Sequence, residues 1–164
     1  MIFYQNILFT SVECDLIRNV NRNFKSISKE DNGSVSYKSF RNTHDSIVND
    51  EFTLNLILEK LKPIGLHSLP IVHHQITYGG RFSPHTDVTT EPRYKTIVIL
   101  LSDPGQYSGA VLSIEGSSVN LQQGNVIVFD VRKLHEVSEL LHGERHTLVM
   151  WTNKDNFNIP KTIL

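Results

Sequence analysis

The sequence has little that would mark a secreted, membrane-bound or nucleic-acid-binding protein. It holds one cysteine, Cys14, so no disulfide can form within the chain, and a lone thiol is compatible with a reducing compartment. Its 16 basic and 17 acidic residues nearly cancel, and no run of Lys and Arg suits a phosphate backbone or an anionic membrane. The apolar segment Met1–Thr10 lacks a basic leader and is too short for a signal peptide or a membrane span. We therefore expect a cytoplasmic protein in which Cys14 is a core residue.

The length and composition indicate one globular domain. A chain of 164 residues can bury about two thirds of the surface that its unfolded form exposes. A hydrophobic content of 39% and a charged content of 20% suggest neither disorder nor a fibre. The chain contains no internal repeat, low-complexity tract or interdomain linker, so a single core is expected.

Two helices are predicted in the first 66 residues. Thr10 and Glu13 have the spacing of a capping box, and apolar residues then recur at helical intervals, which predicts a helix from Ser11 to Phe24. Asp50 can cap a second helix, which a proline and a glycine then end. These stop residues are Pro63 and Gly65.

Between the two helices the pattern predicts a loop and a short strand. The polar stretch Ser26–Ser34 contains Asn32-Gly33, which is typical of a loop or a hairpin turn. Val35–Arg41 could then be a short strand.

After Gly65 the sequence predicts only strands. Short β-branched or apolar runs alternate with turns that carry Gly, Pro, Asp or Asn, and no further helical period appears. Seven or eight short strands indicate a sandwich or a barrel. The predicted strands are Ile71–Tyr78, Thr96–Leu101, Ala110–Ile114, Val119–Leu121, Val126–Phe129, His135–Leu140 and Thr147–Trp151.

Three residues could form a metal site with open coordination positions. In a strand, side chains at i and i+2 lie on the same face, so His85 and Asp87 can both reach one point. His135 follows an apolar strand and can supply a third ligand from a distant part of the chain. Two imidazoles and one carboxylate make the facial set that binds non-haem Fe(II) and leaves three positions open. A lone His-x-Asp is common by chance, so the prediction depends on the combination.

Arg145 is the candidate clamp for an organic acid beside that metal. A 2-oxoglutarate oxygenase needs two open iron positions for the keto acid and one for dioxygen, and the far carboxylate of the keto acid must also be bound. A planar guanidinium binds a buried carboxylate with two hydrogen bonds, which a lysine cannot do. Arg145 lies ten residues after His135, with Gly143 permitting a turn between them.

These residues lie in segments that resemble a known family. The segments TYGGRFSPHTD, LSDPGQYSGAVLSI and LQQGNVIVFDVRKLHEVSELLHGERHTLVMW, within residues 71–153, resemble the prolyl-4-hydroxylase-like branch of the Fe(II)/2-oxoglutarate-dependent dioxygenases. The resemblance implies that His85, Asp87 and His135 bind iron and that Arg145 binds the oxoglutarate carboxylate.

The resemblance also implies a fold, cofactors and a reaction. The fold would be mostly β with N-terminal helices, a double-stranded β-helix or jelly-roll (cupin-like) barrel. Residues 1–66 would form a helical support packed on a catalytic core of residues 67–164, within one structural domain. The cofactors would be Fe(II), 2-oxoglutarate and O2, and ascorbate is a further candidate as reductant. The reaction would hydroxylate a C–H bond, with a prolyl or other residue of a protein or peptide as the leading substrate.

Other substrates and roles stay open on the sequence. The same chemistry could act on a free amino acid, another small metabolite or a nucleobase, and a catalytically silent metal-binding barrel is an alternative from another class. The related alkyl-repair branch has a second arginine where this chain has Trp151, which together with the missing basic patch disfavours a nucleic-acid substrate. No membrane partner is expected, and the oligomeric state is not readable.

The second contact to oxoglutarate departs from the family pattern. Many members have a tyrosine in the strand that corresponds to Ile97–Leu101, which here carries no hydroxyl. Tyr78 and Thr147 are the substitutes that we predict as cofactor-binding residues; the alternatives are a packed aromatic and a solvent-side hydroxyl. Ser108-Gly109 stands where the family often has paired glycines before a strand.

Two further segments are weaker candidates for contact with a substrate. Arg41 to Thr43 resemble the part of the family that approaches the substrate, although a surface turn is the simpler interpretation. The loop Val88–Lys95 follows the His85 pair and could close over the barrel mouth. The remaining histidines fit no second ligand set, and His73 and His74, being adjacent, should face opposite ways in a strand.

Overall fold

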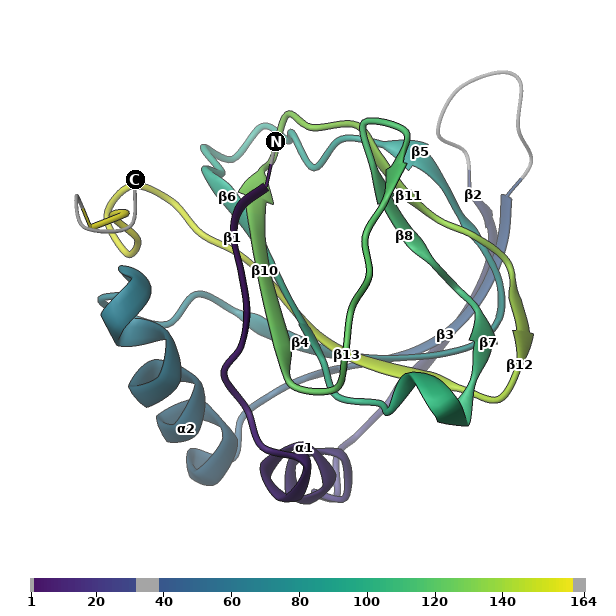
Figure 1. Cartoon of the computed structure of the whole chain (residues 1–164), viewed down its shortest axis with the longest axis horizontal. Helices are drawn as coiled ribbons and strands as arrows, with labels where there is room; N and C mark the ends of the chain where they lie inside the picture. Colours follow the sequence, from purple (N-terminus) through teal and green to yellow (C-terminus); the bar gives the residue numbers. More distant parts are fainter. Residues whose placement is uncertain (1, 32–38, 161–164) are drawn as a thin grey trace.

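Strands from both halves of the chain curve around a central space, with two helices outside them (Figure 1). The computed structural model describes residues 2–31 and 39–160. Its helices are α1 (Ser11–Arg18) and α2 (Glu51–Leu61), with 3-10 turns at Lys62–Ile64 and Pro104–Gln106. Its strands are β1 (Ile2–Ile7), β2 (Lys25–Asp31), β3 (Ser39–Ile47), β4 (Val72–Gly80), β5 (Phe82–His85), β6 (Lys95–Leu100), β7 (Ser108–Gly109), β8 (Leu112–Ile114), β9 (Ser117–Ser118), β10 (Asn125–Asp130), β11 (His135–Val137), β12 (Leu140–His142) and β13 (Arg145–Trp151).

The strands form one large sheet and two small ones, all paired antiparallel. The large sheet has seven strands in the order β1-β10-β6-β13-β4-β3-β2. A second sheet has the order β5-β11-β8-β9, and β12 pairs with β7. In Figure 1 the β5, β11 and β8 strands lie across the central space from β4 and β13. This arrangement confirms the predicted barrel and the mostly β fold class.

The large sheet separates an outer core from an inner one. Along β13, Leu148 and Met150 join the outer cluster, which also contains Ile17 of α1 and Ile57 of α2. Val149, between them, belongs to the inner cluster, within the barrel. Because successive strand residues point to opposite faces, every second residue of β13 is available to the barrel interior.

The two predicted helices exist, but the first is shorter than expected. Thr10 and Glu13 form the predicted capping box, and Asp50 caps α2 through its side chain. The prediction that the first helix reaches Phe24 is wrong. It ends at Arg18, where Asn19 donates its backbone N–H to helix carbonyls and its side-chain amide to the Asp15 carbonyl.

The N-terminal part contributes strands as well as helices. The prediction of a loop over Ser26–Ser34 is wrong for Ser26–Asp31. These residues belong to β2, which pairs with β3 over its whole length. Asn32-Gly33 and most of Val35–Arg41 lie outside the described residues, while Ser39–Arg41 do belong to β3. The division at residue 66 stays a prediction, but residues 1–66 are more than a helical support, since β1, β2 and β3 all join the large sheet.

The strands of the second half agree with the sequence except at four places. Ser108–Gly109 was not predicted as a strand, yet it forms β7 and pairs with β12. Val119–Leu121 is not a strand; the neighbouring pair Ser117–Ser118 forms β9 instead. His135–Leu140 is two strands, because β11 ends at Val137 and β12 begins at Leu140. Phe82–His85 was not predicted, yet it forms β5 and pairs with β11. In the described ranges 2–31 and 39–160, the helices are too short and too polar for any of them to cross a bilayer.

A series of largely buried side-chain hydrogen bonds connects α2 to the large sheet. The Arg22 guanidinium donates to Asp50 (2.9 Å) and to His74 Nδ1 (2.9 Å), and its side chain is 1% exposed. His74 Nε2 then contacts His146 Nδ1 at 3.0 Å, and His146 Nε2 contacts Glu144 at 3.2 Å. Burial would raise the pKa of Asp50, but hydrogen bonds from Thr53 and the charge of Arg22 lower it on balance.

Replacing Asp50 should destabilise the fold far more than removing an exposed helix cap. Asp50→Ala leaves the buried Arg22 charge without its carboxylate, so we expect the free energy of unfolding to fall by about 3–5 kcal/mol. Thr10→Ala removes the exposed cap of α1 and should cost about 1 kcal/mol. Urea unfolding of both variants measures the difference. Similar losses in the two variants would show that the Arg22–Asp50 pair is not a buried anchor.

The buried His74 should make the fold sensitive to mild acid. Burial, together with the charge of Arg22, lowers the pKa of His74 to about 3, whereas the unfolded residue takes up a proton near pH 6.5. The stability that depends on neutral His74 is therefore present above pH 6.5 and lost as the pH falls toward 3.

Between pH 7 and pH 5, this one group should lower the free energy of unfolding by about 2 kcal/mol. The glutamine side chain of His74→Gln can still accept a hydrogen bond from Arg22 and does not titrate. The free energy of unfolding of this variant should therefore fall by about 2 kcal/mol less than that of the wild type over the same interval. Urea unfolding of the metal-free proteins at both pH values provides the comparison. Parallel pH profiles for the wild type and the variant would contradict the assignment.

Candidate metal centre

The barrel interior contains a cavity of about 320 Å³ between the two main sheets. The predicted residues His85, Asp87 and His135 line it together with Arg145 and Thr147. Its apolar lining comes mainly from alternate residues of the large sheet. These are Val98 of β6, Phe129 of β10, and Val149 and Trp151 of β13.

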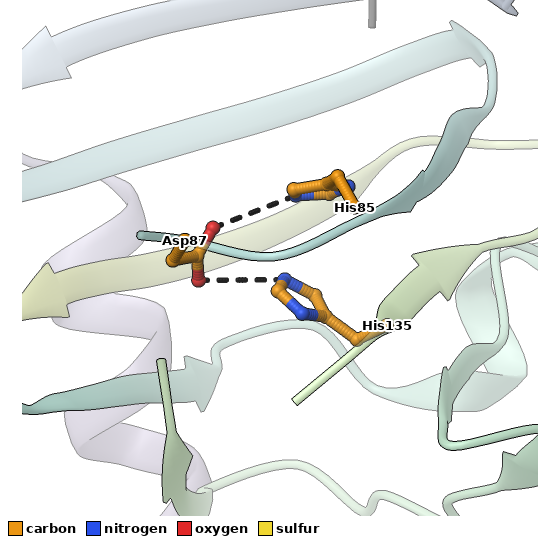
Figure 2. Close-up of side chains that lie close together, drawn as sticks. All are labelled: His85, Asp87 and His135. Carbon is orange, nitrogen blue, oxygen red and sulfur yellow. Dashed lines mark ion pairs between the residues drawn. The ribbon is translucent and has the colours of Figure 1, made fainter. Parts of the chain in front are cut away.

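His85, Asp87 and His135 converge in this cavity, as the sequence predicted (Figure 2). His85 ends β5 and lies directly opposite His135 of β11, so strand pairing brings the two imidazoles together. His85 Nε2 is 3.5 Å from Asp87 Oδ1, and His135 Nε2 is 3.4 Å from Asp87 Oδ2. One ligand atom from each residue lies within 4.8 Å of the others. The donors are therefore close enough to share one metal ion.

Both imidazoles present the same nitrogen to the centre. His85 Nδ1 is 2.7 Å from the Ser83 carbonyl oxygen, and His135 Nδ1 is 2.9 Å from the Lys133 carbonyl oxygen. A carbonyl can only accept, so each Nδ1 carries a proton, and in a neutral ring this leaves the lone pair on Nε2, which faces the centre. Burial lowers the pKa of His135, against the opposing influences of Asp87 and the Lys133 carbonyl. His135 is therefore neutral at pH 7, the state in which imidazole binds a metal.

Asp87 lies two residues beyond the end of β5, in the loop rather than in a strand. Its backbone N–H donates to the Val131 carbonyl (2.8 Å), and Arg93 donates to its carbonyl (3.3 Å). The Thr96 hydroxyl donates to Oδ2 at 2.7 Å. Thr96 was not found by sequence reasoning, because a threonine in an apolar strand gives no signal of its own.

Arg145 is buried at the start of β13 without a carboxylate partner among the described residues. It is 5% exposed, and its Nε has no hydrogen-bond partner. Burial lowers its pKa, and the nearby Tyr107 hydroxyl acts in the opposite direction. A buried guanidinium keeps its charge and is costly to leave unpaired. An acidic ligand in the cavity would remove that cost.

The structure separates the two residues predicted as second contacts to oxoglutarate. Thr147 lies two residues after Arg145 on β13 and lines the cavity with it. Tyr78 is not among the cavity-lining residues; its hydroxyl lies 3.1 Å from Ser26 Oγ and its ring packs on His44. The geometry therefore favours Thr147. Tyr107 is a further residue that the sequence did not reveal, since it reaches Arg145 from a turn rather than from a strand.

The rim of the cavity contains aromatic and charged groups. The Arg93 guanidinium stacks on Trp151 at 4.2 Å, which fixes part of the loop after Asp87. His73 contacts Trp151 and lies 3.1 Å from Asp45, whereas His74 joins the series of buried hydrogen bonds on the other face. The prediction that the two histidines face opposite ways is thus confirmed. Arg41 lines the cavity, on β3 rather than in a surface turn.

Comparison with known proteins identifies the family. A model of the 2OG-Fe(II) oxygenase superfamily matches residues 71–153, which are 83 of the 164 residues. A PKHD-type hydroxylase of Prochlorococcus marinus is 32% identical over 80 residues, 44% of this chain and 36% of the relative. A PKHD-type hydroxylase of Xanthomonas euvesicatoria pv. vesicatoria is 29% identical over 92 residues, 54% of this chain and 37% of the relative. The chain spans between about a third and a half of the length of these curated relatives.

Solved structures share the fold at low sequence identity. A prolyl hydroxylase from Trichoplax adhaerens, in complex with a hypoxia inducible factor peptide fragment, aligns with a TM-score of 0.63 at 14% identity, covering 92% of this chain and 81% of that one. HygX from Streptomyces hygroscopicus, with nickel and 2-oxoglutarate bound, aligns with a TM-score of 0.61 at 14% identity, covering 90% and 81%. These likenesses confirm the double-stranded β-helix. Together with the family match, they confirm the family that the sequence predicted: the chain belongs to the 2OG-Fe(II) oxygenase superfamily.

Proposed function

We propose that this chain is an Fe(II)- and 2-oxoglutarate-dependent dioxygenase that hydroxylates a C–H bond. His85, Asp87 and His135 would hold the iron, and Arg145 would bind the distal carboxylate of oxoglutarate. The observation that carries the proposal is that one cavity contains both a three-donor centre and a buried guanidinium that has no carboxylate partner among the described residues. A metal-binding barrel without catalysis would have no use for the guanidinium.

The donor set fits Fe(II). Two imidazole nitrogens and one carboxylate form the facial set of non-haem iron oxygenases, and the three leave coordination positions for other ligands. Both Nε2 atoms face the carboxylate, so little rearrangement is needed on binding. Membership of the oxygenase superfamily supports the choice of Fe(II) over other divalent metals.

The residues of the chain bind and orient, and none needs to act as acid or base. When bound, Fe(II) supplies, with oxoglutarate and dioxygen, the oxidising power for an unactivated C–H bond. Arg145 offers a fork of N–H donors to the oxoglutarate carboxylate, with the Thr147 hydroxyl on the same face of β13. Tyr107 contacts the guanidinium and helps to hold it. Val98, Phe129 and Trp151 give the cavity wall near the metal centre an apolar surface.

A prolyl or other residue of a protein or peptide is the substrate that we propose. The matched relatives are named PKHD-type hydroxylases, and a Pseudomonas putida prolyl-4-hydroxylase shares the fold with a TM-score of 0.55 at 17% identity. Trp151 and Phe82 line the cavity and are both partly exposed, and their rings suit an apolar side chain. Succinate release in the presence of peptide libraries or metabolite pools, with ascorbate added as reductant, tests this choice. Succinate release with metabolite pools but with no peptide would contradict the proposed protein or peptide substrate.

Anaerobic addition of Fe(II) and then 2-oxoglutarate to the apo-protein should produce the visible charge-transfer band of a chelated keto acid. The band should be absent in His135→Ala, which removes one of the three donors. Far-UV circular dichroism provides the control that the variant is folded. A well-folded wild type that gives no band would refute the proposed cofactor chemistry.

Substitutions around Arg145 should weaken oxoglutarate binding according to the hydrogen bonds to the carboxylate that each one removes. Arg145→Ala should lower the affinity about 100-fold, since a hydrogen bond to a charged group contributes about 1.5–3 kcal/mol. Thr147→Val should lower it less, by about 10-fold, because it removes a single hydrogen bond to the carboxylate and leaves the charge of Arg145 in place. Tyr78→Phe is the matched control, because the Tyr78 hydroxyl bonds Ser26 away from the cavity.

The single tryptophan of the chain, Trp151, lines the cavity and allows this affinity to be followed by fluorescence. If Arg145→Ala bound oxoglutarate as tightly as the wild type, the carboxylate would be bound elsewhere. If Tyr78→Phe weakened binding as much as Thr147→Val, the choice of Thr147 over Tyr78 would be wrong.

A further inference from the structure

The three side chains of the candidate metal centre are held in place by different means. Each imidazole is oriented by a main-chain carbonyl two residues before it, Ser83 for His85 and Lys133 for His135. No side-chain substitution can remove those carbonyls. The Asp87 carboxylate is instead hydrogen-bonded by a side chain of another strand, Thr96 of β6.

Asp87 needs such a partner more than the histidines do. Its backbone is fixed at both ends, by the N–H bond to the Val131 carbonyl and by Arg93 at its own carbonyl. These contacts do not fix the carboxylate, because the terminal torsion of an aspartate is broad and costs little to rotate. The 2.7 Å bond from Thr96 to Oδ2 sets this rotation, with Oδ1 toward His85 and Oδ2 toward His135.

The surroundings of Thr96 leave no ready substitute for that bond. Thr96 is 2% exposed, and its neighbours in the sheet are Phe129 of β10 and Trp151 of β13. Asp87 itself is 8% exposed. A carboxylate that is so largely buried depends mainly on the donors that the protein provides.

We propose that Thr96 is a positioning residue of the metal centre, which holds the Asp87 carboxylate in the orientation that binds the metal. The inference rests on the proposed metal site and adds to it a residue that is not itself a ligand. Loss of a hydrogen-bond partner behind a metal ligand typically lowers metal affinity 10–100-fold. Thr96 should show an effect of that size.

Co(II) binding to the apo-protein tests the inference without any turnover. Thr96→Val keeps the shape of the side chain and removes the donor, so its Co(II) affinity should fall 10–100-fold and its visible Co(II) spectrum should change. Thr96→Ser restores the hydroxyl and should bring the affinity back to within about threefold of the wild type. Thr53→Val removes another buried threonine hydroxyl, on α2 outside the barrel, and should leave both affinity and spectrum unchanged.

Thermal melts of the apo-proteins show whether each variant is folded, and the Ser variant keeps the test valid if the Val variant is not. The inference would be overturned if folded Thr96→Val bound Co(II) as tightly as the wild type, or if Thr96→Ser bound it no better than Thr96→Val. If Thr96→Val does not fold, weak Co(II) binding by folded Thr96→Ser would overturn it. A wild type that binds no Co(II) would refute the metal site itself. The two failures are therefore distinguishable.

Discussion

The antiparallel pairing of β5 with β11 is the contact on which the metal centre depends. It places His85 directly opposite His135, although fifty residues separate them in the chain. The side-chain period of a strand is two, so a slip of one residue in this register would turn one imidazole away from the other. The pairing of β11 with β8 on its other side helps to hold the register. Both strands are short, and their alignment therefore relies on the barrel around them.

The large sheet gives the barrel its two different faces. Outward residues of β13 and β6 pack against the helices in one apolar cluster, while the alternate residues line the cavity. The same alternation that buries Leu148 places Arg145 and Thr147 inside. A charged group can be kept there because the strands on either side are fixed by main-chain hydrogen bonds. β13 pairs with β4 on one side and with β6 on the other, and this pairing positions Arg145 and Thr147 on the cavity wall.

The proposed metal ligands and the oxoglutarate-binding arginine were predictable from the sequence. The residues that hold them in place were not. His85, Asp87, His135 and Arg145 stand out because their types and spacing are rare in combination, and the structure brings all four to one cavity. Thr96 and Tyr107 have ordinary residue types, and only the folded chain shows that they touch Asp87 and Arg145. Tyr78 looked equally suitable in the sequence, but its hydroxyl lies against Ser26 instead.

The errors in the predicted fold have physical reasons. β2 has the sequence KSISKED, without an alternating apolar pattern, and becomes a strand because its backbone pairs with β3. β5 contains Pro84, which argues against a strand in the interior of a sheet, yet β5 lies at a sheet edge where proline is tolerated. The helix predicted to Phe24 stops at Arg18, and the chain beyond it supplies Arg22 to the buried contacts with Asp50 and His74. Tertiary contacts thus decide these segments, and no local pattern reveals them.

The central claim is that one metal ion and one oxoglutarate share the cavity of this chain. X-ray diffraction from crystals grown anaerobically with Fe(II) and 2-oxoglutarate, recorded at the iron absorption edge, tests it most directly. The account predicts a single anomalous peak between His85, Asp87 and His135, with the distal carboxylate of oxoglutarate on Arg145. An iron peak elsewhere, or oxoglutarate bound away from Arg145, would contradict it.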